Sequence, residues 1–555
     1  MRSFDRLNGP LGGLCAGMLH GACMVLAFPP AGVWPLVFVA IVPLVWVSSP
    51  RVRRPRLTST LVAIGSLPAW MYFMHWTAAI SSAGFAPLAV YLSLWPGIFV
   101  HGLRRIRRAH PGWSIVPLTA VVWTGLEFLR GEVVFHGFAW FLLGHPTIAS
   151  PWLSAPGVLG GQYLVSALVA ALNGVIVVRA SAAMRTERNE TSSDHGSRAE
   201  AFTAVALIVV YAVSAALRLH VRVAETPFRI GVVQSNVPQS VRGAWPLEAR
   251  IADFETLISR TVMLGTDAPT PDVIVWPETM FPGDFFDRGS LAAVAQVREK
   301  YPVLYDVTRH FAEGVLSAQR GLGVPLIVGT STYDGLSFER VSQTGTWGFD
   351  HRYNSAVLVI EGEIAPDRYD KMRLAPFGEE MPYISAWPWL EQRLLAFGAS
   401  GMTFDLAKGA RPVRFAINEV TLTTPICFEA TVTSLVRRLD GDVIVNMTND
   451  GWYGAFDGGR RHHELTARWR CVELARPLVR VANTGISGVF DHTGRTINVL
   501  PARQESHAVF EAPLVRRAWR PYAAIGNIFG WTFSGGTILA WCGTYINRRR
   551  SADVA

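Results

Sequence analysis

Residues 420–429 read Val-Thr-Leu-Thr-Thr-Pro-Ile-Cys-Phe-Glu, and they place a thiol where an apolar strand gives way to a helix. The run before Cys427 has the length and apolar character of a buried strand. Phe428 and Glu429 open the helix that we expect to follow. Backbone N–H groups at such a junction lower the pKa of a thiol and can bind an oxyanion. Cys427 is therefore the candidate nucleophile of an enzyme.

Outward from this stretch, residues 221–522 alternate apolar runs of strand length with longer amphipathic stretches. The expected strands are Phe228 to Val233, Asp272 to Trp276, Pro325 to Gly329, Tyr353 to Ile360, Val420 to Ile426, Asp442 to Asn446 and Leu478 to Ala482. The expected helices lie near residues 247–263, 292–319, 430–439 and 463–475. This alternation predicts an α/β sandwich.

Two of the expected strands lead into charged residues that could serve the thiol. Glu278 ends the run Val-Ile-Val-Trp-Pro-Glu, and Lys371 ends the run Tyr-Asp-Lys. A thiol nucleophile needs a base and a group that stabilises developing negative charge. The chain has three lysines, Lys300, Lys371 and Lys408, among 51 basic residues, which indicates sites that require a compact ammonium. Taken singly, Glu278 could equally be a cap or a surface ion-pair partner.

The first 200 residues have the composition of a membrane domain. Only 17% of the chain is charged, and its formal net charge is +9. The first 200 residues hold 15 basic and 7 acidic residues, so +8 of this charge lies there. Because a helix of about 20 apolar residues can cross a bilayer, we expect eight spans, near residues 11–28, 32–48, 58–80, 84–102, 114–129, 161–178, 200–217 and 523–546. An ordinary cytosolic enzyme is excluded.

Arginine clusters predict the orientation of these spans. They occupy both termini and every second loop, at residues 2–6, 51–56, 104–108, 179–198 and 548–550. Under the positive-inside rule both termini are cytoplasmic. The expected domains are a membrane domain of seven helices (1–220), an extracytoplasmic catalytic domain (221–522), and an eighth helix with a cytoplasmic tail (523–555). The alternative for residues 11–28 is a cleaved signal peptide, although no small-residue cleavage site clearly follows.

Other thiols and histidines have plainer interpretations. Cys471 lies in the middle of an expected helix and is a structural thiol, although a disulfide between Cys471 and Cys427 is conceivable in an oxidising compartment. His462 and His463 are adjacent, so they point to different faces of a helix and are expected to be surface or helix-start residues. No metal site is predicted.

In the order Glu278, Lys371, Cys427, these residues resemble the Glu-Lys-Cys triad of the nitrilase superfamily. The flanking motifs are similar to those of its membrane-embedded branch, the apolipoprotein N-acyltransferases. The matching stretches are Trp276 to Glu278, Tyr353 to Ala356, Lys371 to Glu379, Ile426 to Glu429, Asn446 to Trp452, Glu473 to Pro477 and Asn483 to Gly485, with Ala27 to Pro30 and Gly137 to Trp140 in the membrane part. The resemblance implies an eight-span membrane domain joined to a nitrilase-like αββα sandwich.

The resemblance carries two further acidic positions, Glu379 and Glu429, which match glutamates that the family needs near its triad. From the residues alone, Glu379 could instead pair with Arg373, and Glu429 could be a favourable partner of a helix dipole. Phe428 stands where many members have tyrosine, so the role of that hydroxyl is absent.

Two tryptophans are expected to bind substrate. The resemblance implies that Trp452 lines an acyl pocket, and that Trp245 overlies the site, although Trp245 is preceded by extra residues in this chain. The apolar segments Phe281 to Phe286, Ile384 to Leu390 and Leu394 to Phe397 follow two catalytic segments. We expect them to be mobile arms that dip into lipid, and the alternative is ordinary core.

The function implied by the resemblance is lipoprotein maturation in the bacterial cytoplasmic (inner) membrane. A phospholipid donates an acyl chain to Cys427 as a thioester, and the N-terminal amine of a diacylated lipoprotein accepts it. No cofactor and no nucleic acid is involved, and a monomer is expected. The alternatives are a membrane-tethered nitrilase-type amidase that hydrolyses a small amide, and a transporter or scaffold with an inactive domain. For transport, only Glu127 and Arg130 place charge near a span.

The arginine clusters generate a topology prediction. A reporter enzyme that works only outside the cytoplasm should be active when it is fused after Lys300 and silent when it is fused after Glu190, because these positions flank opposite ends of the seventh span. Reporter activity in whole cells checks this. The reverse pattern would place Cys427 in the cytoplasm and exclude lipoprotein N-termini as acceptors.

Overall fold

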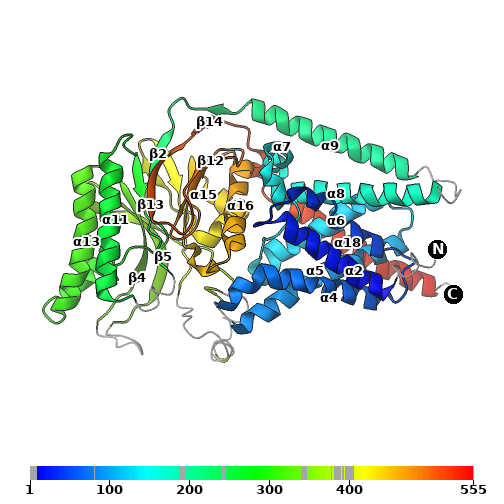
Figure 1. Ribbon diagram of the computed structural model, residues 1–555, viewed down its shortest axis with the longest axis horizontal. Helices are drawn as coiled ribbons and strands as arrows, with labels where there is room; N and C mark the ends of the chain where they lie inside the picture. Colours follow the sequence, from blue (N-terminus) through cyan, green and yellow to red (C-terminus); the bar gives the residue numbers. More distant parts are fainter. Residues whose placement is uncertain are drawn as a thin grey trace.

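The computed structural model describes residues 9–79, 82–186, 195–238, 245–338, 347–376, 378–380, 389, 393 and 406–553. Within these ranges the molecule is elongated (Figure 1). One end is a bundle of long helices, and the other is a pair of β-sheets with helices on both outer faces.

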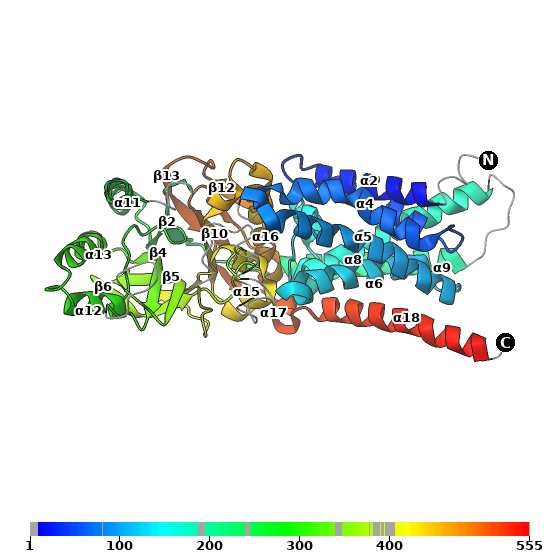
Figure 2. The same cartoon turned by 90° about the horizontal axis from the view of Figure 1, so that it is seen from below.

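The bundle collects the apolar N-terminal segments and the last helix of the chain (Figure 2). Its helices are α2 (Pro10–Ala27), α3 (Val42–Val47), α4 (Pro55–Met74), α5 (Ser82–Ala109), α6 (Ile115–Phe128), α7 (Pro151–Ser154), α8 (Gly157–Thr186), α9 (His195–Leu219) and α18 (Ile528–Asp553). In the described part of the chain, five helical stretches are long and apolar enough to cross a membrane: Pro10–Ala27, Pro55–Ala78, Gly84–Ala109, Gly157–Ala183 and Glu200–Leu219. The count of eight spans stays a prediction.

Two of the expected spans have an irregular local form. Residues 32–48 form a 3-10 helix, η1 (Trp34–Phe38), and then α3, and each of these begins with a proline in its first turn. Proline fits a first turn because its missing N–H would be unpaired there anyway, so the second proline starts a new helix. The span expected at 114–129 is α6, which continues beyond Phe128 as the π-helix η3 (Leu129–Val133).

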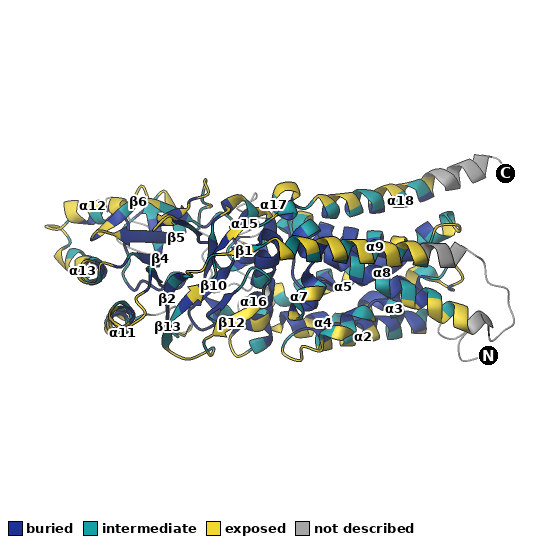
Figure 3. Cartoon of the chain, turned by 90° about the horizontal axis from the view of Figure 1, so that it is seen from above, coloured by how far each residue is buried: buried dark blue, intermediate teal, exposed yellow. Residues whose placement is uncertain are grey.

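Helix α2 packs closely against α4 through glycine. A side chain on Gly17 would overlap the carbonyl oxygen of Val62, and one on Gly65 would overlap that of Leu14. Small residues let two helix backbones approach closely. In an apolar environment, van der Waals packing then stabilises the contact. By contrast, α9 is exposed along most of its length (Figure 3), with Phe202 and Ile208 among its exposed side chains.

The other half of the molecule contains two six-stranded sheets. The first has the order β13-β2-β3-β4-β5-β6 and the second β12-β11-β10-β9-β8-β7. The first comprises β2 (Phe228–Gln234), β3 (Val273–Val275), β4 (Leu326–Asp334), β5 (His351–Ile360), β6 (Glu363–Asp370) and β13 (Ser506–Ala512). The second comprises β7 (Phe415–Ile417), β8 (Val420–Thr423), β9 (Val443–Thr448), β10 (Leu478–Ala482), β11 (Gly488–Phe490) and β12 (Thr496–Val499). A short pair, β1 (Arg222–Val223) and β14 (Val515–Arg517), lies outside both sheets.

These elements form four layers. The first sheet is covered by α11 (Leu247–Thr266), α12 (Arg288–Gln296) and α13 (Pro302–Leu322), and the second by α15 (Thr433–Leu439) and α16 (Asp457–Leu474). Buried side chains of both sheets, such as Val232, Val445 and Val481, form one core between them. The expected α/β sandwich is confirmed.

The local differences from the expected elements follow from proline. The helix expected at 292–319 is two helices, because Pro302 starts α13. The strand expected to reach Ile426 ends at Thr423, since Pro425 has no N–H for a sheet hydrogen bond. Cys427 then begins a five-residue 3-10 helix, η7 (Cys427–Thr431), and the expected helix starts at Thr433.

The sandwich and the bundle share a packed boundary. Trp469 and Val472 of α16 belong to the same buried cluster as the bundle residues Phe28 and Phe141. The Trp469 indole N–H donates to the carbonyl oxygen of His145 at 3.1 Å, and the Gln162 N–H donates to Glu473 at 2.9 Å. The sandwich and the bundle therefore pack directly against each other, so side chains from both can line one site.

Candidate active site

The three residues of the predicted triad lie at one edge of the sandwich. Glu278 follows β3, Lys371 follows β6, and Cys427 follows β8 of the facing sheet. The Lys371 ammonium nitrogen lies 3.3 Å from Glu278 Oε1 and 2.7 Å from Glu379 Oε1. Lys371, Glu379 and Cys427 line a common cavity of about 120 Å³. The structure thus brings together residues that are up to 149 positions apart in the chain.

Glu278 is buried and accepts hydrogen bonds on both carboxylate oxygens. The Asn354 side-chain amide donates to Oε1 at 2.8 Å, and the backbone N–H of Asn449 donates to Oε2 at 2.7 Å. Donors aimed at a carboxylate stabilise its charged form, which is the form that a general base requires. The sequence did not indicate that Asn354 and Asn449 would donate to Glu278, although both residues lie in stretches that resemble the family.

Lys371 is the centre of charge in the site. Burial by itself would lower the pKa of its ammonium, but the carboxylates of Glu379 and Glu278 outweigh burial and hold that pKa above its usual range. Lys371 therefore stays a cation beside the thiol. The possibility that Glu379 pairs with Arg373 is wrong, because Glu379 binds Lys371 and the Arg373 guanidinium donates to the carbonyl oxygen of His136.

The Cys427 thiol differs electrostatically from the expectation. Burial, and then the negative charge of Glu278, raise its pKa above the usual range, and Lys371 opposes them only in part. The expected lowering of this pKa is wrong, because burial and the charge of Glu278 outweigh the groups that would lower it. The thiol is protonated at rest and has to lose its proton during attack. Its backbone is held at φ +50°, a left-handed conformation that costs energy for a residue with a Cβ.

A buried polar cluster fixes the peptide group after the nucleophile. His463 Nε2 lies 3.2 Å from the carbonyl oxygen of Cys427, and Arg480 lies 3.0 Å from His463 Nδ1. Burial lowers the pKa of His463, and the positive charge of Arg480 lowers it further, so the ring is neutral. The carbonyl oxygen of Cys427 can only accept, so this hydrogen bond requires the ring proton on Nε2, while Nδ1 lies 3.0 Å from both Arg480 and Asp450. A peptide is planar, so this bond also sets the direction of the Phe428 N–H.

The expectation that the two adjacent histidines are surface residues is wrong. His462 and His463 are both buried. His462 stacks on Phe141 with ring centroids 4.0 Å apart, and His463 lies 3.0 Å from Asp450. Within the described ranges, no group of three or more His, Cys, Asp or Glu residues could hold a metal ion.

Glu429 joins the two loops that carry Lys371 and Cys427. Its carboxylate accepts from the backbone N–H groups of Ile426, Met372 and Arg373, each at 2.7 or 2.8 Å. It also accepts from the Tyr369 hydroxyl at 2.8 Å. Burial raises the pKa of Glu429 to about 7, and these donors oppose the rise. The helix-start interpretation holds in part, because Glu429 lies in the first turn of η7 and accepts from the N-cap N–H of Ile426. Glu429 does more than this, since it also binds the backbone of the Lys371 loop.

One wall of the cavity comes from the helix bundle. Phe428, Trp452 and Tyr453 line it from the sandwich, and Phe138 and Trp140 line it from the bundle. Trp245 does not line it, because its indole N–H donates to Asp253 of α11 at 2.8 Å. The structure therefore gives Trp245 no place at this cavity, while residues 239–244 before it lie outside the described ranges.

The three apolar segments that were expected to be mobile arms have different outcomes. Phe281, Phe285 and Phe286 are buried among core side chains of the sandwich, so the prediction of a mobile arm there is wrong. Residues 384–390 and 394–397 lie outside the described residues, apart from Trp389.

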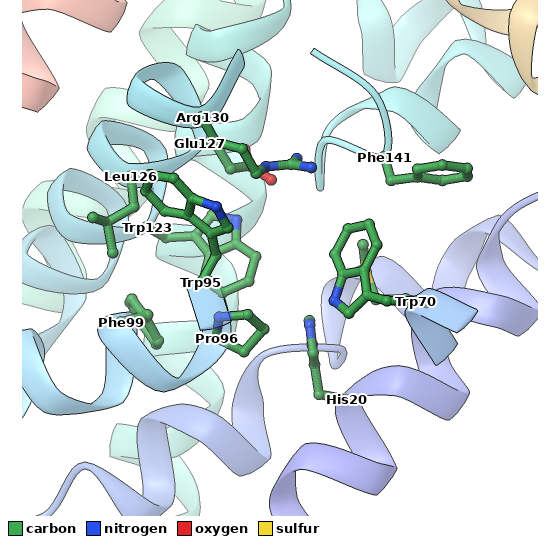
Figure 4. A pocket seen from close by; sticks show the side chains of 11 residues that line it. His20, Trp70, Trp95, Pro96, Phe99, Trp123, Leu126, Glu127, Arg130 and Phe141 are labelled. Carbon is green, nitrogen blue, oxygen red and sulfur yellow. The ribbon is translucent and has the colours of Figure 1, made fainter. Parts of the chain in front are cut away.

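The two charged residues near the fifth span hold the bundle wall in place. Glu127 accepts from the Leu143 N–H at 2.7 Å, and an Arg130 nitrogen donates to the Trp140 carbonyl oxygen at 2.8 Å. Figure 4 shows the Glu127 and Arg130 side chains next to each other. It also shows Phe141, which lies in the same loop as Trp140 and Leu143. Their charges stabilise a loop that lines the cavity, so they give no support to transport.

Comparison with known proteins identifies relatives for both halves. The family model described as apolipoprotein N-acyltransferase N-terminal domain matches residues 20–175, and the model described as carbon-nitrogen hydrolase matches residues 229–523. A Geobacter metallireducens protein named apolipoprotein N-acyltransferase is 27% identical over 97% of this chain and 96% of its own length. A protein of that name from Rhizobium meliloti is 29% identical over 87% of each chain.

Solved structures with a related arrangement are more distant. A crystal structure of an amidase from a Nesterenkonia species is 15% identical and covers 52% of this chain and 92% of its own, with a TM-score of 0.35. A carbon-nitrogen hydrolase from Helicobacter pylori is 12% identical over 51% and 88%, with a TM-score of 0.33.

The geometry of Lys371 predicts that arginine cannot replace it. The longer planar guanidinium would keep the charge but misplace the donor by about an ångström. Loss of such a donor costs on the order of 3 kcal/mol, so Lys371→Arg should slow acylation of Cys427 by an ester substrate about a hundredfold or more. Single-turnover labelling measures this rate. Lys300→Arg, on the far side of the sandwich, should acylate normally, and a normal rate for Lys371→Arg would leave Lys371 a purely structural ion-pair partner.

The pKa of Cys427 predicts a second result. In the unliganded protein, alkylation of Cys427 by iodoacetamide should show no inflection in the ordinary cysteine range near about pH 8.5. In Glu278→Gln the inflection should move to lower pH, because a repelling charge is gone while Lys371 remains. Acylation should nevertheless fall roughly a hundredfold to ten-thousandfold, because the base is lost.

The matched control is Glu363→Gln, since Glu363 is an exposed glutamate that pairs with Arg288. Both the alkylation profile and the acylation rate should be unchanged in it. A wild-type inflection below pH 8 would mean that the thiolate exists before substrate binds, and would contradict the argument from burial.

Proposed function

Because the chain belongs to the carbon-nitrogen hydrolase family and carries the N-terminal domain of the apolipoprotein N-acyltransferases in front of it, we propose that it is an apolipoprotein N-acyltransferase. It transfers an acyl chain from a phospholipid to the N-terminal amine of a lipoprotein. The observation that carries the substrate class is the shared wall, because aromatic side chains of the helix bundle line the cavity of Cys427. A lipid chain can enter such a cavity directly from a bilayer.

In the first half-reaction, Glu278 takes the proton of Cys427 while the sulfur attacks the ester carbonyl of the phospholipid. The carbonyl oxygen becomes an oxyanion, which the Lys371 ammonium and the Phe428 N–H stabilise. The tetrahedral intermediate expels the lysophospholipid alkoxide, which takes the proton back from Glu278. The products are a thioester on Cys427 and a free lysophospholipid.

In the second half-reaction, the neutral α-amine of diacylglyceryl-cysteine attacks the thioester carbonyl. The same two donors stabilise the oxyanion, and Glu278 accepts the proton that the amine loses. Collapse of the intermediate expels the Cys427 thiolate, which Glu278 reprotonates. The product is an amide, which is more stable than the thioester, so no nucleotide is needed to drive the transfer.

The aromatic lining of the cavity supports transfer over hydrolysis. Water competes with the amine for the thioester, and an apolar wall on the membrane side keeps the concentration of water low. The alternative hypothesis, a membrane-tethered amidase, would use the same triad. It gives no reason for a cavity whose wall is held by Glu127 and Arg130 of the bundle.

The cellular setting belongs to the same proposal. We infer an enzyme of the bacterial inner membrane with eight spans and a catalytic domain, residues 221–522, on the extracytoplasmic face, between membrane segments 1–220 and 523–555. It works as a monomer without a cofactor. Glu379 supports Lys371, Glu429 supports both catalytic loops, and Trp452 and Phe428 contact the acyl chain. Trp245, which binds Asp253 of α11, is not part of this proposal.

The proposal predicts the path of a labelled acyl chain. Purified protein that is given phospholipid labelled in one acyl chain should carry the label on Cys427 as a hydroxylamine-sensitive thioester. A diacylated lipopeptide with a free N-terminal amine should then remove the label to that amine, and an acetylated lipopeptide should leave it on the protein. Mass spectrometry of protein and lipopeptide measures both steps.

Cys471 provides the control for the nucleophile. Cys427→Ala should form no labelled protein although it still folds, and Cys471→Ala should keep most activity, because Cys471 is buried in α16 away from the cavity. Prompt release of the label as free fatty acid without any acceptor, or turnover of small amides in place of phospholipid, would establish a hydrolase.

A further inference from the structure

A second, larger cavity lies at the boundary between the sandwich and the bundle. It has a volume of about 600 Å³ and is lined by α15, the end of η3, the link between α17 (Pro521–Ile525) and α18, and residues 372 and 373. Figure 2 shows α15, α17 and the start of α18 side by side. None of its lining residues lines the cavity of Cys427, so the two are separate sites.

The lining of this cavity carries excess positive charge. Arg373, Arg437 and Arg438 line it, and Glu132 is its one acidic lining residue among those described. The Glu132 carboxylate already accepts from the Tyr163 hydroxyl at 3.1 Å. An anion that enters the cavity therefore meets more positive than negative charge.

The three arginines are not equally committed to structure. Arg437 donates to the Ala523 carbonyl oxygen at 2.9 Å and so anchors α17. Arg373 donates to the His136 carbonyl oxygen, but its Nε is buried without a hydrogen-bond partner in the described part of the chain. Arg438 is exposed on α15. Within the described residues Arg373 thus keeps an unpaired donor, and the exposed Arg438 is accessible to a ligand. A phosphate offers acceptors that match a guanidinium.

The rim of the cavity is apolar on the side of the bundle. Ile525, Ile528 and Trp531 line it there, and these residues are 45%, 51% and 60% exposed. Ile528 and Trp531 lie at the start of α18, which is expected to be the last membrane span, and Ile525 ends α17 just before it. Tryptophan is enriched at the level of lipid headgroups, and exposed isoleucine at that depth can contact acyl chains. A free inorganic anion would leave this apolar rim unused.

We propose that this cavity binds one anionic glycerophospholipid, with its phosphate at Arg373 and Arg438 and its chains along Ile528 and Trp531. This lipid is not the acyl donor, because its site is separate from Cys427. It lies directly behind the catalytic segment, since the backbone N–H groups of Met372 and Arg373 bind Glu429, next to Lys371. The lipid therefore braces the segment that positions the catalytic ammonium.

A photoreactive lipid tests this site. The probe is a dialkyl ether phosphatidylglycerol with a diazirine on its headgroup, because an ether cannot acylate Cys427. In detergent-purified full-length protein, it should label peptides of α15 and of the α17–α18 link. Arg438→Gln should weaken half-maximal labelling about tenfold, since a charged hydrogen bond is lost, and Arg438→Lys should restore part of it. Peptide mass spectrometry locates the label.

The controls separate the sources of phosphate. Arg517→Gln removes an exposed arginine of β14 that does not line the cavity, and should label like wild type. The matching phosphatidylcholine probe should label weakly. Displacement of the probe by millimolar inorganic phosphate would establish a free-anion site and overturn the lipid. Labelling that ignores Arg438→Gln, or that falls only near Trp452, would also overturn the proposal. Because no acyl transfer is required, the outcome is independent of the proposed function.

Discussion

The buried ammonium of Lys371 between two carboxylates is the constraint on which the rest of the site depends. Charges removed from water persist only when they are paired and hydrogen-bonded, and removal of one partner typically costs about 3–5 kcal/mol. Glu278 and Glu379 supply more negative charge than Lys371 neutralises, so Asn354 and the Asn449 N–H complete the shell of Glu278. A resting thiolate would add another buried anion, which explains why the thiol stays neutral until it attacks.

The helix bundle supplies one wall of the cavity that Lys371 and Cys427 line. Trp140 and Phe138 reach the cavity from a loop that Glu127 and Arg130 hold by its backbone. Polar groups that deep in an apolar bundle are costly unless they satisfy each other or the main chain. Here they fix one wall of the cavity that Cys427 also lines.

The segment after β6 has two faces with different roles. Lys371 points to the cavity of Cys427, and Arg373, two residues later, lines the cavity on the opposite side. The N–H groups between them are bound by Glu429, which also holds the loop of the nucleophile. Both cavities border this short backbone segment, so a ligand in the second cavity contacts the same segment as a ligand in the cavity of Cys427. The two cavities nevertheless share no lining residue.

The sequence by itself determined the α/β sandwich and put Glu278, Lys371 and Cys427 near strand ends, because strand periodicity is a local property. Only the resemblance to a known family joined these three residues into a predicted triad. The sequence also placed the apolar helices, although the number that cross a membrane stays a prediction. It could not place Trp245, the buried pair His462 and His463, or the Phe281 segment, since burial depends on which distant elements pack there. Only the tertiary structure decided that Glu379 binds Lys371, that Glu429 brackets two loops, and that the thiol pKa is raised. These properties arise from burial and from partners far away in the chain, and neither quantity is written in the order of neighbouring residues.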